Sequence, residues 1–150
     1  MSCCCEEKKE LGIYLVPDGI MPEYKTEGAS GLDCHARLAC DFIKIPKKSR
    51  CLVNLGFALE LPEGYEAQIR PRSGNTSKGI DIGFGTIDFD FKGEVKACVI
   101  NNSDGDFEIH NGDRICQLVI QKVEKFPIKQ VDHLSKTKRG TSGIGSTGIK

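Results

Sequence analysis

The 150-residue sequence lacks any apolar run long enough to cross a bilayer, which takes roughly 18 to 20 consecutive apolar residues. That absence excludes a membrane-spanning helix and predicts no membrane partner. The first ten residues, MSCCCEEKKE, also lack the basic segment and apolar core of a secretory signal. We therefore expect an intracellular protein of the cytoplasm, with the nucleus left open for a eukaryotic or viral source.

The sequence also lacks the cysteine and histidine spacing of a zinc site. Eight cysteines are present, but they form no C-x-x-C pair, and the three histidines lie far apart. Without export the thiols are expected to stay reduced. Cys98 and Cys116 stand among Ala, Val and Ile and are interpreted as small buried hydrophobes. The cluster Cys3–Cys5 leaves acylation or oxidation open beside a frayed terminus.

Neither sign of charge is in excess, since 21 basic and 21 acidic residues give a net charge of zero. The charges are nevertheless uneven, because residues 121–150 carry a net +5 and residues 1–120 a net −5. Broad nucleic-acid binding needs one continuous positive face, so it is not predicted. A basic tail on an acidic body suits contact with an anionic ligand, although a solvated tail without a ligand is the alternative.

Helical periodicity is missing too, and residues 75–78 allow one helical turn at most. Short apolar runs separated by turn residues predict strands instead. We expect these strands at residues 11–16, 32–38, 42–45, 51–61, 65–70, 86–88, 95–101, 107–109 and 114–123. Regular short strands with turn chemistry are typical of an all-β sandwich or barrel-like fold.

The length suits one folded domain with two extensions. We expect residues 1–10 to form a disordered N-terminal extension and residues 11–134 to form a single β-barrel domain. Residues 135–150 are polar, basic and rich in glycine, without hydrophobic periodicity. They are predicted to form a mobile C-terminal arm.

Two glycine-containing turns place charged side chains beside adaptable backbone. In ASGLD, Asp33 follows a tight turn at the start of a strand, and an ordinary turn aspartate is the alternative. In RPRSG, a guanidinium and a hydroxyl lie between Pro71, which fixes φ, and Gly74. Successive N–H groups beside an arginine can form an anion-binding nest. Pairing of Arg72 with a surface acid is the competing interpretation.

Two further segments could carry chemistry. In GTIDFDFKGE, Asp88 lies between apolar neighbours, so it could be partly desolvated and act as a general base on water. A turn at residues 90–93 would bring Phe91 to the same ligand, whereas the competing interpretation is a charged hairpin at a sheet edge. In NGDRICQL, a turn precedes a strand, and a structural ion pair between Asp113 and Arg114 stays open.

The arm contains GIGSTG, which has the form G-x-G-x-x-G. A dinucleotide site of that form requires a following helix, and only two residues follow Gly148, so such a site is not expected. Glycines, hydroxyls and the nearby Arg139 are still suited to wrapping a phosphate.

In this order, ASGLD, RPRSG, GTIDFDFKGE, NGDRICQL and RGTSGIGSTG resemble the five motifs of the homotrimeric dUTPase family, the deoxyuridine triphosphate nucleotidohydrolases. The resemblance covers about residues 9–148. It implies a jelly-roll or distorted β-barrel subunit with a flexible C-terminal arm, assembled as a homotrimer whose active sites are shared among three chains. Family members hydrolyse dUTP to dUMP and pyrophosphate with Mg²⁺, which limits uracil incorporation into DNA and supplies dUMP for dTMP synthesis.

The resemblance also implies residue roles. Asp88 would orient and deprotonate the attacking water, and Asp33 would hold Mg²⁺ through water. The implied substrate-binding residues are Arg72, Ser73, Gly74 and Gln117 at the phosphates, Gly83, Gly85, Thr86 and Ile87 at the uracil edge, Phe91 at the deoxyribose, and Arg139, Ile144, Gly145, Ser146 and Thr147 in the arm. The family usually has Tyr in place of Phe91 and an aromatic residue in place of Ile144.

Two rival hypotheses stay open. One is a catalytically weak relative whose main role is to bind a protein partner, and the other is the related dCTP deaminase, which shares the fold. The set of Asp33, Arg72, Asp88 and Arg139 favours the hydrolase over the first rival. The third and fifth motifs favour it over the second.

Overall fold

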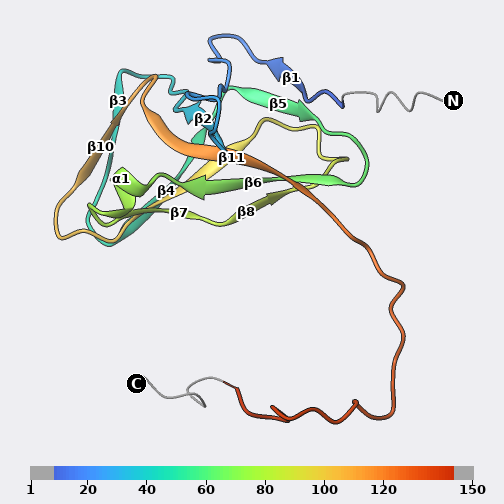
Figure 1. The fold of residues 1–150 in the computed structure, drawn as a ribbon. Helices are drawn as coiled ribbons and strands as arrows, with labels where there is room; N and C mark the ends of the chain where they lie inside the picture. Colours follow the sequence, from blue (N-terminus) through green and yellow to red (C-terminus); the bar gives the residue numbers. More distant parts are fainter. Residues whose placement is uncertain (1–8, 144–150) are drawn as a thin grey trace, which may run out of the picture.

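The computed structural model describes residues 9–143, and nearly all of its regular structure is β-strand (Figure 1). The elements are β1 (Gly12–Leu15), β2 (Leu32–His35), β3 (Phe42–Ile45), β4 (Ser49–Asn54), β5 (Phe57–Glu60), β6 (Tyr65–Pro71), α1 (Ser73–Thr76), β7 (Ile80–Gly83), β8 (Gly85–Ile87), β9 (Lys96–Asn101), β10 (Phe107–His110) and β11 (Arg114–Lys122). The predicted all-β class is confirmed. No helix in the described range is long and apolar enough to cross a membrane.

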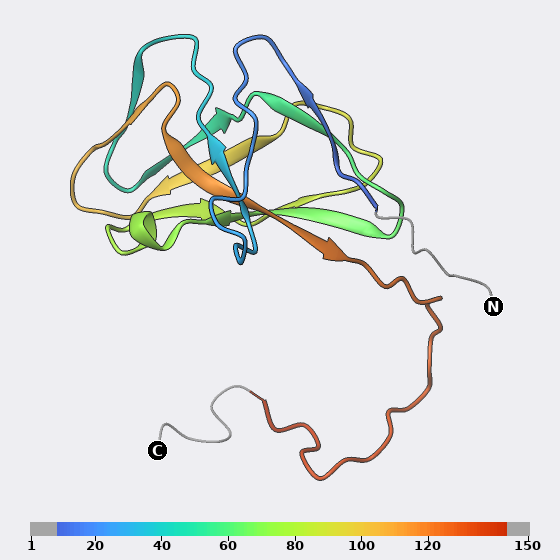
Figure 2. The same cartoon turned by 45° about the horizontal axis from the view of Figure 1, so that its top comes forward.

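The strands form four antiparallel sheets around a common interior (Figure 2). The largest has the order β2-β11-β6-β8, the next has the order β4-β9-β7, and β1-β5 and β10-β3 form two-stranded sheets. Within residues 9–143 these sheets stay separate, so the barrel that the sequence suggested as one option does not close. The arrangement instead leaves strand edges free, and one of these edges matters for the site.

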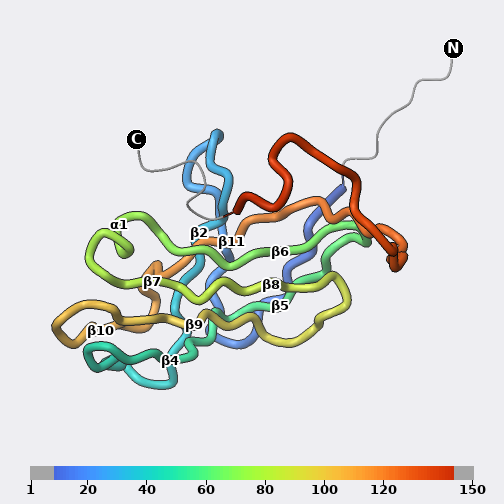
Figure 3. Tube along the Cα trace, turned by 90° about the horizontal axis from the view of Figure 1, so that it is seen from below, coloured from blue at the N-terminus to red at the C-terminus, as the bar shows by residue number. Residues whose placement is uncertain are grey.

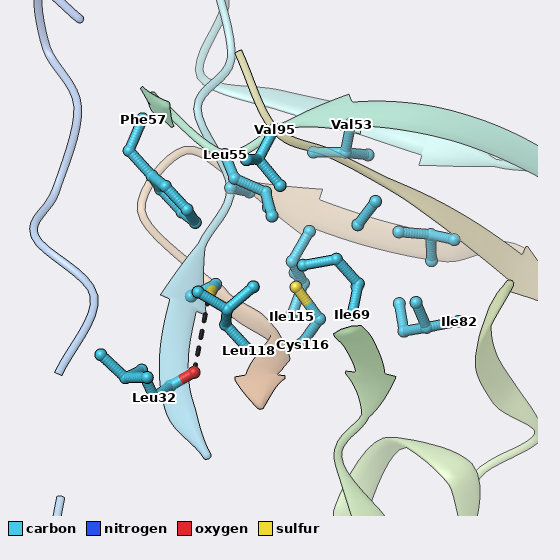
Figure 4. Close-up of a cluster of buried hydrophobic side chains, with 14 of the residues drawn as sticks. Leu32, Val53, Leu55, Phe57, Ile69, Ile82, Val95, Ile115, Cys116 and Leu118 are labelled. Carbon is cyan, nitrogen blue, oxygen red and sulfur yellow. Dashed lines mark hydrogen bonds between the residues drawn. The ribbon is translucent and has the colours of Figure 1, made fainter. Parts of the chain in front are cut away.

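Apolar side chains from the facing sheets fill the interior. Figure 4 shows Phe57 and Leu55 on one side of this core, with Leu118 and Ile69 across from them. All four are almost completely buried. Burying a side chain of this size stabilises the fold by about 1.5–3 kcal/mol, so this interior holds the sheets that carry the site in place.

The two cysteines interpreted as buried hydrophobes differ in their surroundings. Cys116 is fully buried in β11, as predicted, and it lies opposite Cys34 of β2. The hydrogen bond with Cys116, and then burial, raise the pKa of the Cys34 thiol, so this thiol is a poor nucleophile. Cys98 is only half-buried, because it lies on the outward side of β9.

One predicted strand is divided in two. The apolar run 51–61 is interrupted at Gly56, which has a φ of +80° and lies against Gly19. A Cβ at Gly56 would lie 2.7 Å from the Gly19 Cα. The Gly56 N–H donates to Glu94 Oε1 at 3.1 Å, so the bend between β4 and β5 is fixed by a long-range contact.

The chain leaves the folded body after β11. Residues 124–143 are exposed and contain no regular element (Figure 1). Their large apolar side chains are Phe126, Ile128, Val131 and Leu134, which are 56% to 101% exposed. The last strand thus ends at Lys122, before the expected start of the arm at residue 135.

Candidate active site

A cavity of about 320 Å³ opens where one strand changes partners. β7 pairs with β9 up to the contact of Gly83 with Cys98, whereas β8 pairs with β6 from the contact of Gly85 with Ile69. Figure 3 shows β7 and β8 in succession, running between β9 and β6. The segment that follows, residues 91–96, leads into β9 and therefore does not pair with β8. The cavity is lined by Ile69, Gly85, Thr86, Ile87, Asp88, Phe91, Glu94, Val95 and Lys96.

Backbone polar groups are available inside this cavity. β8 is the last strand of the four-stranded sheet, so within the described residues its edge away from β6 pairs with no other strand. An unpaired strand edge presents alternating N–H and C=O groups. Gly85, Thr86 and Ile87 can thus offer donors and acceptors to the polar edge of a planar ring, and Gly83 lies just before them.

The structure brings Asp88 and Phe91 to the rim of the same cavity. The Phe91 N–H donates to the Asp88 carbonyl at 3.1 Å, which closes the turn between them. Gly93 makes room for the ring, because a Cβ there would lie 2.6 Å from Phe91 Cζ. Asp88 itself is exposed, so within this chain its apolar neighbours do not desolvate it.

Asp88 also lines a larger cavity of about 480 Å³. Glu63, Glu66 and Asp90 line it, and Lys125 lies 5.8 Å from the centre of the Phe89 ring at its border. Its carboxylates would repel a polyanion. The smaller cavity is thus the better candidate for a nucleotide.

A second cluster forms where β2, β6 and β11 meet. The Asp33 carboxylate lies 3.5 Å from Arg72 Nε and 3.1 Å from Arg114 Nη1. Arg72 Nη1 also donates to the Arg114 carbonyl at 2.9 Å. Asp33 is therefore no ordinary turn aspartate, and Arg72 pairs with a largely buried acid, 15% exposed, rather than with a surface acid. Two guanidinium groups against one carboxylate leave an excess of positive charge for an anion.

Arg114 does not form the ion pair with Asp113 that the sequence left open. The Asp113 carboxylate instead accepts the His110 N–H at 2.8 Å and fixes the turn before β11. Arg114 was thus missed as a member of the charged cluster, because its partner Asp33 is distant in the sequence. The pairing of β11 with β2 creates this contact.

Gln117 and α1 complete the second cluster. Gln117 lies between Asp33 and Arg70 in strand register, and its Nε2 donates to the Pro71 carbonyl at 2.9 Å. A Cβ at Gly31 would lie 2.5 Å from Gln117 Oε1, so the glycine in ASGLD gives this amide its space. Ser73 and Gly74 open α1 and are exposed beside Arg72.

His35 adds no positive charge to the cluster near neutral pH. Burial lowers its pKa, and the nearby Lys25 lowers it further. Its Nδ1 is buried without a hydrogen-bond partner in the described part of the chain. The positive charge of the cluster thus comes from the two arginines.

The cavity that Asp88 lines and the charged residues around Asp33 lie far apart within one chain. Ile87 is level with Ala67 on β6, and Arg72 follows that position by five residues. At about 3.3 Å per residue, the backbone of Asp88 lies almost 20 Å from that of Arg72. Within one chain the two side chains would have to bridge this separation to reach one triphosphate.

The arm residues are only partly described. Arg139 is exposed, and its Nε donates to the Ser142 carbonyl at 2.9 Å. Ile144, Gly145, Ser146 and Thr147 lie outside the described residues.

Known proteins resemble the chain along most of its length. The dUTPase family model matches residues 18–148. The deoxyuridine 5'-triphosphate nucleotidohydrolase of Hydrogenobaculum sp. is 49% identical over 138 residues, covering 89% of this chain and 93% of the relative. The protein of the same name from Treponema denticola is 46% identical over 143 residues, covering 93% and 99%.

Solved structures share the architecture. The Staphylococcus bacteriophage 80alpha dUTPase with dUPNHPP has a TM-score of 0.86 at 25% identity and covers 93% of this chain and 99% of its own. A point mutant of the dUTPase from S. aureus phage phi11, described with a structural Mg(II) ion, has a TM-score of 0.77 at 22% identity, covering 85% and 100%. The expected jelly-roll-like fold is thereby confirmed.

Proposed function

The chain belongs to the dUTPase family, and from that premise we propose that Asp88 activates the water by which this dUTP diphosphatase converts dUTP to dUMP and pyrophosphate. The observation that carries the proposal is the position of Asp88 at the rim of a cavity lined by a free strand edge. A nucleoside held there would present its α-phosphate to this carboxylate. Asp88 would then take a proton from water as the oxygen attacks phosphorus, and pyrophosphate would leave.

The uracil base would bind to the edge of β8. Backbone groups of Gly85 and Ile87 would pair with its polar edge, while Thr86 lines the cavity between them. The Phe91 ring at the rim would pack on the deoxyribose, where a ribose 2′-hydroxyl would be crowded. These contacts select a deoxyuridine by shape and hydrogen bonding together.

The triphosphate would bind to the second cluster. Arg72, with the exposed start of α1 beside it, would contact phosphate oxygens. Asp33 and the Arg114 carbonyl hold the Arg72 guanidinium in place. A positioned cation stabilises charge that grows on the leaving pyrophosphate, and Gln117 and Arg139 would assist it.

We further propose that Mg²⁺ arrives with the triphosphate. Within residues 9–143 no group of three His, Cys, Asp or Glu side chains could hold a metal. Mg²⁺ usually keeps several waters and binds through one or two carboxylates plus substrate phosphates. The Asp33 carboxylate already accepts contacts from Arg72 and Arg114, so it fits contact through a metal-bound water. When bound, the ion would neutralise phosphate charge.

We propose that the active site is shared between copies of the chain. The separation of Asp88 from Arg72 in one chain supports this proposal, because a second copy could bring the two groups together. The exposed apolar residues of 126–134 support this assembly, because such surface usually marks a protein interface. A homotrimer with three shared sites accounts for both observations.

We expect the protein to have about three times the mass of one chain in solution. Burial of the 126–134 apolar side chains provides the driving force. Multi-angle light scattering measures the mass directly. A monomer that hydrolyses dUTP at full rate would contradict the shared site.

The reaction itself is tested by product analysis with dUTP, UTP, dTTP and dCTP. We expect turnover of dUTP alone at an appreciable rate, with dUMP and pyrophosphate formed in equal amounts. Free ammonia from dCTP would indicate a deaminase. Absence of any product would favour the catalytically weak, protein-binding alternative. No contact among the described residues supports that alternative.

A further inference from the structure

The exposed ring of Phe84 has no role in the proposed chemistry of hydrolysis. Phe84 joins β7 to β8 and is 68% exposed. Glycines stand on both sides of it, and Gly85 lines the smaller cavity. The ring is thus an apolar surface placed next to the candidate nucleotide site.

The burial of the flanking strands indicates the face on which Phe84 stands. Ile82 of β7 and Ile87 of β8 are both buried, although they are an odd number of positions apart. Strict alternation would place them on opposite faces, so one extra residue is inserted at the junction. Regular alternation from β8 then places Phe84 on the outward face together with Thr86, which agrees with the exposure of both.

A base bound to the edge of β8 would have two different faces. Because its polar edge pairs with the strand, its ring continues the plane of the sheet. One ring face is then directed to the core side, where Ile69 and Val95 line the cavity. The other is directed outward, to the side on which Phe84 and Thr86 stand.

We propose that the ring of Phe84 covers the outward face of the pyrimidine base, an assignment that rests on the proposed function. Thr86 on the same face has no ring to stack. Phe91 lies at the rim, where the sugar is expected. The arm, residues 135–150, contains no Phe, Tyr or Trp and so brings no aromatic ring to the base.

Phe84 contributes to substrate binding rather than to the chemical step. The base is remote from the reacting phosphorus, so its stacking is the same in the ground state and in the transition state. An interaction of this kind lowers KM and leaves kcat unchanged. It also tolerates different bases, because every base has a π-face.

Phe84→Ala is expected to raise the KM for dUTP by about 5- to 20-fold, with kcat within about twofold, as for loss of one stacked base contact. Phe84→Leu, which keeps apolar volume but no ring, should behave likewise, and Phe84→Tyr should restore the KM. Tyr14→Ala is the matched control, since Tyr14 is 69% exposed, lies on β1 and does not line the cavity. Its KM should be that of the unmodified chain.

A binding measurement separates this proposal from the hydrolysis itself. The chain has no Trp, so Phe84→Trp places a single reporter at this position. Its fluorescence should change on titration with dUMP, which is not hydrolysed, whereas that of Tyr14→Trp should not. This titration gives an answer even if the unmodified chain fails to hydrolyse dUTP.

Three results would overturn the assignment. The first is an unchanged KM in Phe84→Ala while the unmodified chain hydrolyses dUTP, which would leave the proposed function intact. The second is a silent Phe84→Trp reporter at saturating dUMP. The third is a lower mass of Phe84→Ala in light scattering, which would place the ring in an interface between copies of the chain.

Discussion

Asp88→Asn is expected to lower kcat for dUTP by roughly 10² to 10⁴ while nucleotide binding stays within several-fold. The amide keeps the size of the side chain and its place at the rim of the cavity, but it cannot accept a proton from water. Single-turnover measurements with saturating dUTP and Mg²⁺ report the chemical step, and binding of dUMP reports the site.

Asp90→Asn is the matched control for this loss. Asp90 is an exposed carboxylate two residues further on, and it lines the larger acidic cavity but not the smaller one. Both variants remove one negative charge from the same turn, so a general electrostatic effect would appear in both. If Asp88→Asn keeps more than about a tenth of the turnover, far above what loss of a general base leaves, Asp88 is not the base.

Much of the strand pattern follows from local sequence. The strand at Phe42–Ile45 has the predicted bounds, and β11 ends one residue before its predicted end. Alternating apolar residues and turn glycines are local signals, so the strands that they predict are also found in the folded chain. In contrast, the division at Gly56 depends on contacts with Gly19 and Glu94, which no local pattern contains.

β7 was missed although its residues alternate. Ile80-Asp81-Ile82-Gly83 is short and ends in glycine, and its partner β9 comes later in the chain. The junction at Phe84 is also a tertiary feature, because it exists only where the chain passes from one sheet to another. The cavity arises from that passage, so the sequence did not predict that Glu94 and Lys96 line it.

The charged cluster was predictable in part. Asp33 and Arg72 stood out because glycine-containing turns precede or follow them, whereas Gln117 was implied only by the family resemblance. The structure brings all three together. Their distance from Asp88 could not be judged from the sequence, because it depends on strand length and register. The separation within one chain is the reason that we propose a site shared between copies.

Removing residues 136–150 is expected to lower kcat by about 10²-fold with a smaller effect on substrate binding. The segment carries Arg139 and the glycine-rich GIGSTG sequence, which suit contact with the β- and γ-phosphates. Contacts that form as the site closes act on the transition state more than on the ground state. Steady-state kinetics with dUTP measures both constants. A truncated chain with an unchanged kcat would show that the arm is a solvated tail.

The truncated chain and Asp88→Asn together give the sharpest test of a shared site. If Asp88 and the arm at one site come from different copies, then a trimer of both variants can hold one site with an intact Asp88 and an intact arm. Coexpression with two affinity tags isolates such mixed assemblies, and their activity should exceed that of either parent by at least about tenfold, since each parent lacks one catalytic group in every site. If Asp88 works only with the arm of its own chain, every site in the mixture has one defect. Mixed assemblies of trimeric mass with no recovered activity would therefore rule out sharing between these two groups.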